Sequence, residues 1–149
     1  MIDSPSMPHA ITIEPIGHIS TPFREKFGIP RQPGLVKSVR ATVHLNPHPH
    51  WREALKGLET FSHVWIVGWF HQTGSKTWLP SIRPPRLGGN RKIGVLASRS
   101  PHRPNPIFLS AVQLIGIRFL ENGGAEIEVA GLDALDGTPI LDIKPYLPY

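Results

Sequence analysis

The sequence contains no cysteine among its 149 residues. Disulfide bonds, thiolate metal ligands and cysteine nucleophiles are therefore excluded, and this absence fits a reducing compartment. No apolar run approaches the roughly 20 residues that a membrane-spanning helix requires. Residues 1–9 lack the basic, apolar and small-residue order of a signal peptide, and we expect them to be flexible. We therefore expect a cytoplasmic protein.

Acidic residues are also absent between Glu59 and Glu121, whereas eight lysines and arginines lie in that stretch. The whole chain has 16 Lys and Arg against 11 Asp and Glu, a net charge of +5. Unopposed positive charge is typical of a protein that binds a polyanion such as RNA, because each neutralised phosphate releases counterions. A basic surface that only maintains solubility is the alternative. The proline-rich frame of residues 99–106 favours an ordered binding surface over that alternative.

Apolar periodicity predicts at least five strands and one short helix. Alternating apolar and polar residues over 39–45 are typical of a half-buried strand. Residues 61–70 are apolar on both faces, so a barrel interior is expected to cover one face and a second subunit the other. The segment 46–58 carries apolar residues at helical spacing. Further strands are predicted at 10–19, 93–97, 107–119 and 125–130.

So many strands beside a single helix argue against a doubly wound nucleotide-binding fold. The predicted fold class is mostly β, a closed or partly open β-barrel with one short helix and no Rossmann domain. A chain of 149 residues is the size of one ordinary domain. We therefore expect a single domain over residues 1–149.

Several short patterns are weak candidates for chemistry. His48 and His50 flank a proline, but a metal site needs at least a third ligand, and we predict no metal. Ser98, Ser100 and Ser110 lie near His102 in the sequence, but none has the glycine-flanked turn of a hydrolase nucleophile. The pair Gly88-Gly89 matches neither a phosphate-binding loop nor a dinucleotide fingerprint, and predicts a turn.

Three loops carry polar groups suited to a ligand. His71-Gln72 follows the strand at 61–70, Pro30-Arg31-Gln32 is stiffened by proline, and 132–139 contains two carboxylates. An arginine is able to hold a carboxylate in bidentate fashion, and aspartates accept hydrogen bonds from ribose hydroxyls or an ammonium group. Taken alone, His71-Gln72 is explained equally well as a strand cap, and the other two loops are better explained as plain turns.

These loops and the proline frame form an ordered set of motifs that extends from about Ile13 to the end of the chain. The motifs are Pro30-Arg31-Gln32, Phe61-Ser62-His63-Val64-Trp65 with His71-Gln72, Arg83-Pro84-Pro85-Arg86-Leu87-Gly88-Gly89-Asn90, Arg99-Ser100-Pro101-His102-Arg103-Pro104-Asn105-Pro106-Ile107, and Leu135-Asp136-Gly137-Thr138-Pro139 with Asp142-Ile143-Lys144-Pro145-Tyr146. In this order they resemble the TsaA-like family, also called YaeB-like or tRNA methyltransferase O.

The resemblance implies a non-Rossmann β-barrel methyltransferase that binds S-adenosylmethionine near a homodimer interface. It implies methylation of the exocyclic nitrogen of threonylcarbamoyladenosine next to the anticodon of tRNA. A non-catalytic module that binds S-adenosylmethionine or RNA is the alternative. For the proton of the target nitrogen, the candidate acceptors are Asp136 and His71.

The family's cofactor contacts correspond to a set of residues in five parts of this chain. They are Pro30, Arg31, Gln32, His71, Gln72, Arg99, Leu109, Asp133, Ala134, Leu135 and Asp136. Four cations are predicted to bind the phosphates of the anticodon loop, namely Arg86, Arg91, Lys92 and Arg103.

Overall fold

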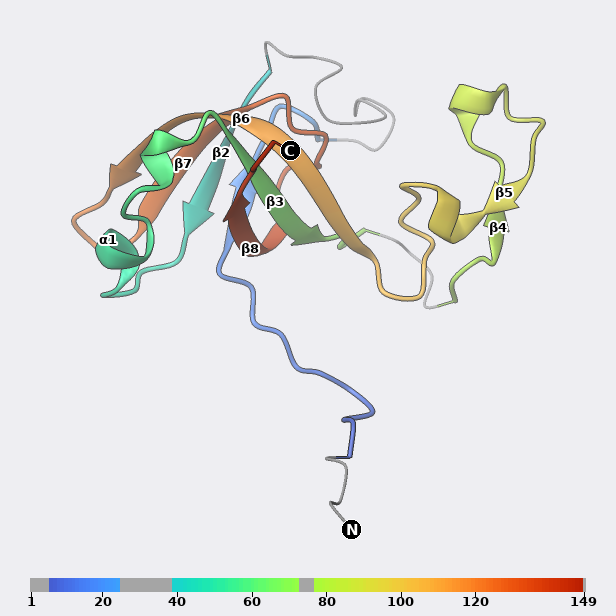
Figure 1. Ribbon diagram of the computed structural model, residues 1–149, viewed down its shortest axis with the longest axis horizontal. Coiled ribbons are helices and arrows are strands. Elements are labelled where there is room, and N and C mark those ends of the chain that lie inside the picture. Colours follow the sequence, from blue (N-terminus) through green and yellow to red (C-terminus); the bar gives the residue numbers. More distant parts are fainter. Residues whose placement is uncertain (1–5, 25–38, 73–76, 149) are drawn as a thin grey trace.

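The computed structural model describes residues 6–24, 39–72 and 77–148 (Figure 1). Six of its strands close into an antiparallel barrel in the order β1-β2-β7-β6-β3-β8. The barrel strands are β1 (Gly17–Ser20), β2 (Arg40–Leu45), β3 (His63–Trp69), β6 (Ile107–Phe119), β7 (Ala125–Ala130) and β8 (Pro139–Pro145). The mostly β fold with a closed barrel is therefore confirmed.

Strand β6 organises the barrel because its 13 residues pair with two neighbours. Its first half pairs with β3, with Ile107 opposite Trp69, and its second half pairs with β7, with Phe119 opposite Ala125. The barrel closes where β1 meets β8, with Gly17 opposite Ile140. Every strand of the barrel therefore has two hydrogen-bonded neighbours, which removes exposed sheet edges.

The core fills the barrel interior with the inward-facing residues of each strand. Alternate positions of β3 are buried, and Val64 and Ile66 have no exposed surface. On the other face of β3, Trp65 and Val67 are half-buried, while Trp69 is 36% exposed. Within the described chain, the barrel thus covers one face of this apolar strand and leaves the other partly open.

Three predicted elements differ from the structure. The helix expected over 46–58 is limited to α1 (Trp51–Ala54), followed by the 3-10 turn η2 (Leu58–Thr60), since Gly57 between them has a left-handed φ of 91°. The strand expected over 93–97 is only β5 (Ile93–Gly94), and η4 (Val95–Ala97) follows it. The strand expected over 10–19 begins at Gly17. Strand β8 was not predicted, because its terminal prolines are typical of turns.

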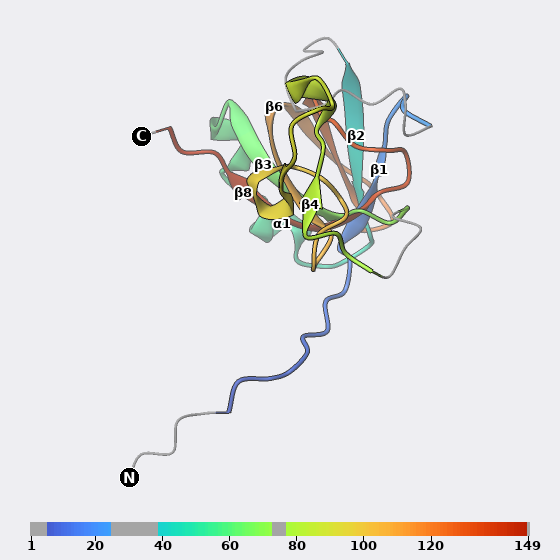
Figure 2. The same ribbon diagram turned by 90° about the vertical axis from the view of Figure 1, so that its right-hand side faces the viewer.

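A segment between β3 and β6 forms a separate small unit, which we call the arm (residues 77–106). It contains a two-stranded sheet of β4 (Ser81–Ile82) and β5, the 3-10 turn η3 (Pro85–Leu87), and η4. Figure 1 shows β4 and β5 beyond the beginning of β6, on the side of the barrel away from α1, and Figure 2 turns this side toward the viewer. Residues 77–106 therefore form short regular elements between two barrel strands.

Candidate functional site

The loop that follows β7 brings two carboxylates to one end of the barrel. Strand β7 runs antiparallel to β6, with Ala130 opposite Gln113, so residues 131–136 continue past the first half of β6. Asp133 thereby reaches Ser110, and Arg99 arrives at the same place from the base of the arm. The pairing of β6 with β7 and the position of Arg99 in the arm thus bring three separate segments together.

A hydrogen-bonded cluster holds these segments together. The Nη1 of Arg99 donates to the carbonyl oxygen of Leu109 at 2.8 Å, and its Nη2 donates to both Ser110 Oγ and Asp133 Oδ2 at 3.0 Å. The hydroxyl of Ser110 donates to Asp133 Oδ1 at 2.6 Å. The Asp133 side chain is only 7% exposed, and a buried carboxylate is costly unless it is paired and hydrogen-bonded. Arg99 is the charged partner, and Ser110 is the second donor.

The turn at Asp136 is fastened to the chain that follows β1. The backbone N–H of Thr21 donates to Asp136 Oδ1 at 3.0 Å, and the Thr21 hydroxyl donates to the carbonyl oxygen of Ala134 at 3.0 Å. The N–H of Asp136 itself donates to the carbonyl oxygen of Phe23. These bonds fix the orientation of a half-buried carboxylate at the barrel end.

His71 comes to the same turn from the far end of β3. A Cβ atom built on Gly137 would lie 3.9 Å from His71 Nε2, and the φ of +80° at Gly137 favours glycine there. The His71 side chain is exposed, as is that of Gln72 beside it. An imidazole and a carboxylate 65 positions apart in the sequence therefore lie around one turn.

The structure thus brings most of the predicted cofactor residues to one end of the barrel. These residues are Arg99, Leu109, Asp133, Ala134, Leu135 and Asp136, with His71 next to the turn and Gln72 following it. Pro30, Arg31 and Gln32 lie outside the described residues. Sequence reasoning missed Ser110 as part of this cluster and considered it only as a nucleophile. The sequence did contain a signal for it, because Ser110 is a hydroxyl residue among inward-facing positions of β6 that are otherwise apolar.

The predicted RNA-binding cations belong to the arm. Arg91 and Lys92 are exposed just before β5, and Arg86 belongs to η3. Arg103 is half-buried, and its Nη1 donates to the carbonyl oxygens of Ser98 at 2.9 Å and Ser100 at 3.4 Å. Arg103 therefore has an intramolecular role in the arm that the sequence did not indicate.

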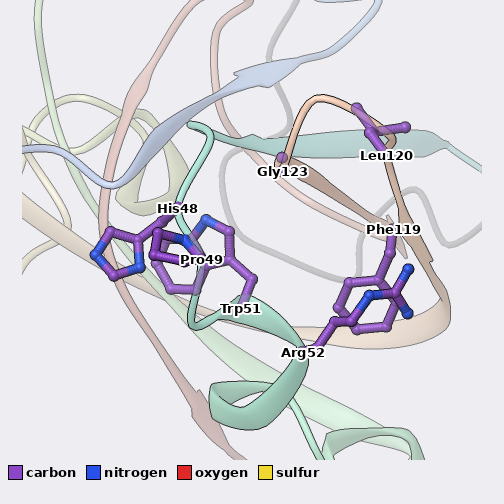
Figure 3. A pocket seen from close by; sticks show the side chains of 8 residues that line it. His48, Pro49, Trp51, Arg52, Phe119, Leu120 and Gly123 are labelled. Atoms are coloured by element: carbon purple, nitrogen blue, oxygen red, sulfur yellow. The ribbon is translucent and has the colours of Figure 1, made fainter.

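A shallow pocket of about 100 Å³ lies at the opposite end of the barrel, beside α1 (Figure 3). His48, Trp51, Arg52 and Phe119 line it, and the Arg52 guanidinium lies 4.6 Å above the Phe119 ring. Among the described residues no group of three metal ligands occurs, and no helix has the length and apolar character that crossing a membrane requires.

The fold and the cluster define the class of protein. It is a small closed antiparallel β-barrel that carries a charged cluster at one end and a basic arm beside it, with no nucleotide-binding α/β domain among the described residues. The sequence pattern of the tRNA-methyltransferase O N-terminal domain matches residues 18–149. The chain therefore belongs to the tRNA-methyltransferase O family, as its motifs indicate.

Individual relatives agree with this assignment. The chain is 50% identical over 136 residues to the tRNA (adenine(37)-N6)-methyltransferase of Escherichia coli, covering 91% of this chain and 57% of the relative. It is 39% identical to a "Probable S-adenosyl-L-methionine-binding protein" of Pyrococcus abyssi, covering 95% and 71%. The crystal structure of TrmO from Pseudomonas aeruginosa superimposes with a TM-score of 0.73 at 46% identity, covering 94% and 57%. The chain spans little more than half the length of the bacterial methyltransferase it matches.

Proposed function

We propose that this chain is an S-adenosylmethionine-dependent methyltransferase that methylates the exocyclic nitrogen of threonylcarbamoyladenosine next to the anticodon of tRNA. The observation that carries the proposal is the convergence of Arg99, Asp133, Asp136 and His71 at one end of a barrel of this family. The name of the Escherichia coli relative, which specifies adenine N6 at position 37, supports the substrate. A cytoplasmic location belongs to the same proposal, since tRNA is its substrate.

The chemistry of the cluster fits the proposed cofactor. S-adenosylmethionine presents a carboxylate, an ammonium group and ribose hydroxyls, which call for a cation and for acceptor oxygens. Asp136 uses Oδ1 for Thr21, and its second oxygen accepts no hydrogen bond from the described part of the chain. Asp133 carries two bonds on its two oxygens, and a carboxylate has about four acceptor positions. Both aspartates therefore keep acceptor capacity for a ligand.

In this proposal Arg99, Leu109 and residues 133–136 hold the cofactor together with His71, Gln72 and the segment Pro30-Arg31-Gln32. When bound, S-adenosylmethionine supplies an activated methyl group on a sulfonium. The lone pair of the target nitrogen is delocalised, so the proton on that nitrogen has to leave as the new bond forms. Asp136 or His71 accepts this proton, and alignment of the target nitrogen by the barrel end contributes much of the acceleration.

The arm supplies the surface for the RNA backbone. No acidic residue lies between Glu59 and Glu121, so the cations of the arm meet no opposing charge within that stretch. Arg86, Arg91, Lys92 and Arg103 are the proposed phosphate contacts. Arg103 contributes chiefly by holding the arm in shape, because its guanidinium is bonded to backbone carbonyls.

A homodimer is part of the proposal. Trp69, Ile107 and Leu109 are 36%, 37% and 45% exposed, and they lie on the outward face where β3 pairs with β6. A second copy covering this face would bury apolar surface next to the cofactor residue Leu109. Light scattering of the wild type should give the mass of two chains, and Ile107→Asp should give one. A monomeric wild type at micromolar protein would contradict the dimer.

The experiment for the activity uses methyl-labelled S-adenosylmethionine and tRNA from cells that lack the N6-methyl modification, followed by nucleoside analysis. We expect N6-methylated threonylcarbamoyladenosine as the labelled product. Cofactor binding without transfer would instead favour the non-catalytic binding module, which the name of the Pyrococcus abyssi relative supports. A protein that neither binds the cofactor nor transfers its methyl group would contradict both the methyltransferase and a cofactor-binding module.

A further inference from the structure

Ser110 occupies an unusual place for a hydroxyl group. It lies at an inward position of β6 between Phe108 and Val112, opposite Ile66 of β3, and has no exposed surface. Phe108, Val112 and Ile66 are all part of the buried apolar core. A hydroxyl in such surroundings is costly unless its hydrogen bonds are made inside the protein. What Ser110 binds therefore determines what it does.

Both hydrogen bonds of Ser110 connect charged groups of the candidate site. Its O–H donates to Asp133 Oδ1 at 2.6 Å, while its oxygen accepts from Arg99 Nη2 at 3.0 Å. The other Asp133 oxygen accepts from the same Arg99 nitrogen. With both oxygens bonded, the carboxylate cannot rotate freely, so the hydroxyl sets the orientation of Asp133 and the position of the loop that carries it.

We propose that Ser110 is a positioning residue for the cofactor, acting through Asp133 and Arg99 and without touching the cofactor itself. This inference rests on the proposed function, because residues 133–136 are proposed cofactor contacts. Removal of the hydroxyl leaves a nearly buried carboxylate oxygen without its donor. The carboxylate then rotates toward other donors and carries the loop away from its binding geometry.

The decisive variants are Ser110→Ala and its control Val112→Ala. Both remove atoms from neighbouring inward positions of β6, but only the first removes a bond to Asp133. We expect Ser110→Ala to weaken S-adenosylmethionine binding about tenfold or more, measured by calorimetry. Val112→Ala should lower the melting temperature at least as much as Ser110→Ala does. It should change the dissociation constant for the cofactor by less than about twofold. In turnover assays, Ser110→Ala should raise the KM for cofactor and leave the KM for tRNA unchanged.

A double-mutant cycle tests whether Ser110 acts through Asp133. In the Asp133→Asn background, Ser110→Ala should change cofactor affinity by less than about twofold, because the partner charge is already gone. If Ser110→Ala fails to fold, Ser110→Cys fills the position with a slightly larger group that is a weaker donor, and it is judged by the same criterion. An unchanged affinity in the folded single variant, or an equal loss in the Asp133→Asn background, would overturn the inference. A wild type that binds no cofactor would overturn the proposed function, and the inference with it.

Discussion

Replacement of Arg99 by lysine tests whether the cluster at the barrel end stabilises the fold. The guanidinium serves three acceptors in different directions, namely the Leu109 carbonyl oxygen, Ser110 Oγ and Asp133 Oδ2. A lysine ammonium keeps the positive charge, but as a compact point charge it does not reproduce the planar fork of arginine. In Arg99→Lys, at least one of the three acceptors therefore loses its donor.

The expected loss of stability follows from the burial of those acceptors. A hydrogen bond to a charged group contributes about 1.5–3 kcal/mol, and a neutral one about 0.5–1.5 kcal/mol. The Arg99 side chain is 43% exposed, so water replaces part of what is lost. We therefore expect the free energy of unfolding to fall by about 2 kcal/mol. For a chain of this size that corresponds to a melting temperature lower by about 4–8 °C.

Urea unfolding followed by tryptophan fluorescence measures this loss, since the chain has four tryptophans. The denaturation midpoint should shift while the slope with urea stays constant. The control is Arg118→Lys, because Arg118 pairs with Glu126 on the surface with its own side chain 70% exposed. That variant should lose less than about 0.5 kcal/mol. Equal losses of unfolding free energy in the two variants would refute the reasoning that burial makes the hydrogen bonds of Arg99 more stabilising than a surface ion pair.

Three further predictions concern packing, chemistry and RNA. Gly68→Ala should destabilise the protein by about 2 kcal/mol or more in urea unfolding, because the added Cβ would lie 2.3 Å from the Phe108 ring. Asp136→Asn keeps an oxygen for the Thr21 N–H and removes the charge, so the methyl-transfer rate at saturating cofactor should fall about 100-fold. Arg91→Ala combined with Lys92→Ala should weaken tRNA binding and reduce the slope of its salt dependence by about two, in filter binding at several salt concentrations.

Each of these predictions has a clear contradictory result. Gly116→Ala is the matched control for packing, since nothing lies within 4 Å of its added Cβ, and equal destabilisation of both glycine variants would contradict the steric argument. An Asp136→Asn protein with the wild-type rate would exclude Asp136 as the proton acceptor. A salt dependence unchanged in the double arm variant would show that Arg91 and Lys92 do not contact phosphates.

Much of the barrel could be predicted from local patterns. The strands at 107–119 and 125–130 were predicted with the bounds that the structure has, because alternate burial leaves a period of two in the sequence. The helix was predicted too long, because Trp51, Leu55 and Leu58 pack against the core from a short helix and a 3-10 turn that Gly57 separates. Strand β8 was missed because Pro139 and Pro145 at its ends are typical of turns.

The candidate site was predicted in part. Arg99, Asp133, Asp136 and His71 followed from the resemblance to a family, and their polar character from the residues themselves. Local sequence carries no information about how these residues pair across the molecule. Ser110 was missed for this reason, because its partner Asp133 is 23 positions away and reaches it only through the pairing of β6 with β7.

The sequence by itself determined the type of chemistry that is possible and which face of most strands is buried. It also determined that the chain belongs to the tRNA-methyltransferase O family. It excluded cysteine chemistry, and it concentrated unopposed positive charge between Glu59 and Glu121. Only the tertiary structure decided which charged groups meet, because a side-chain hydrogen bond needs contact at about 3 Å. Such contact depends on strand register and on closure of the barrel. Both are properties of the whole sheet, since each strand's alignment is set by its neighbours as well as by its own residues.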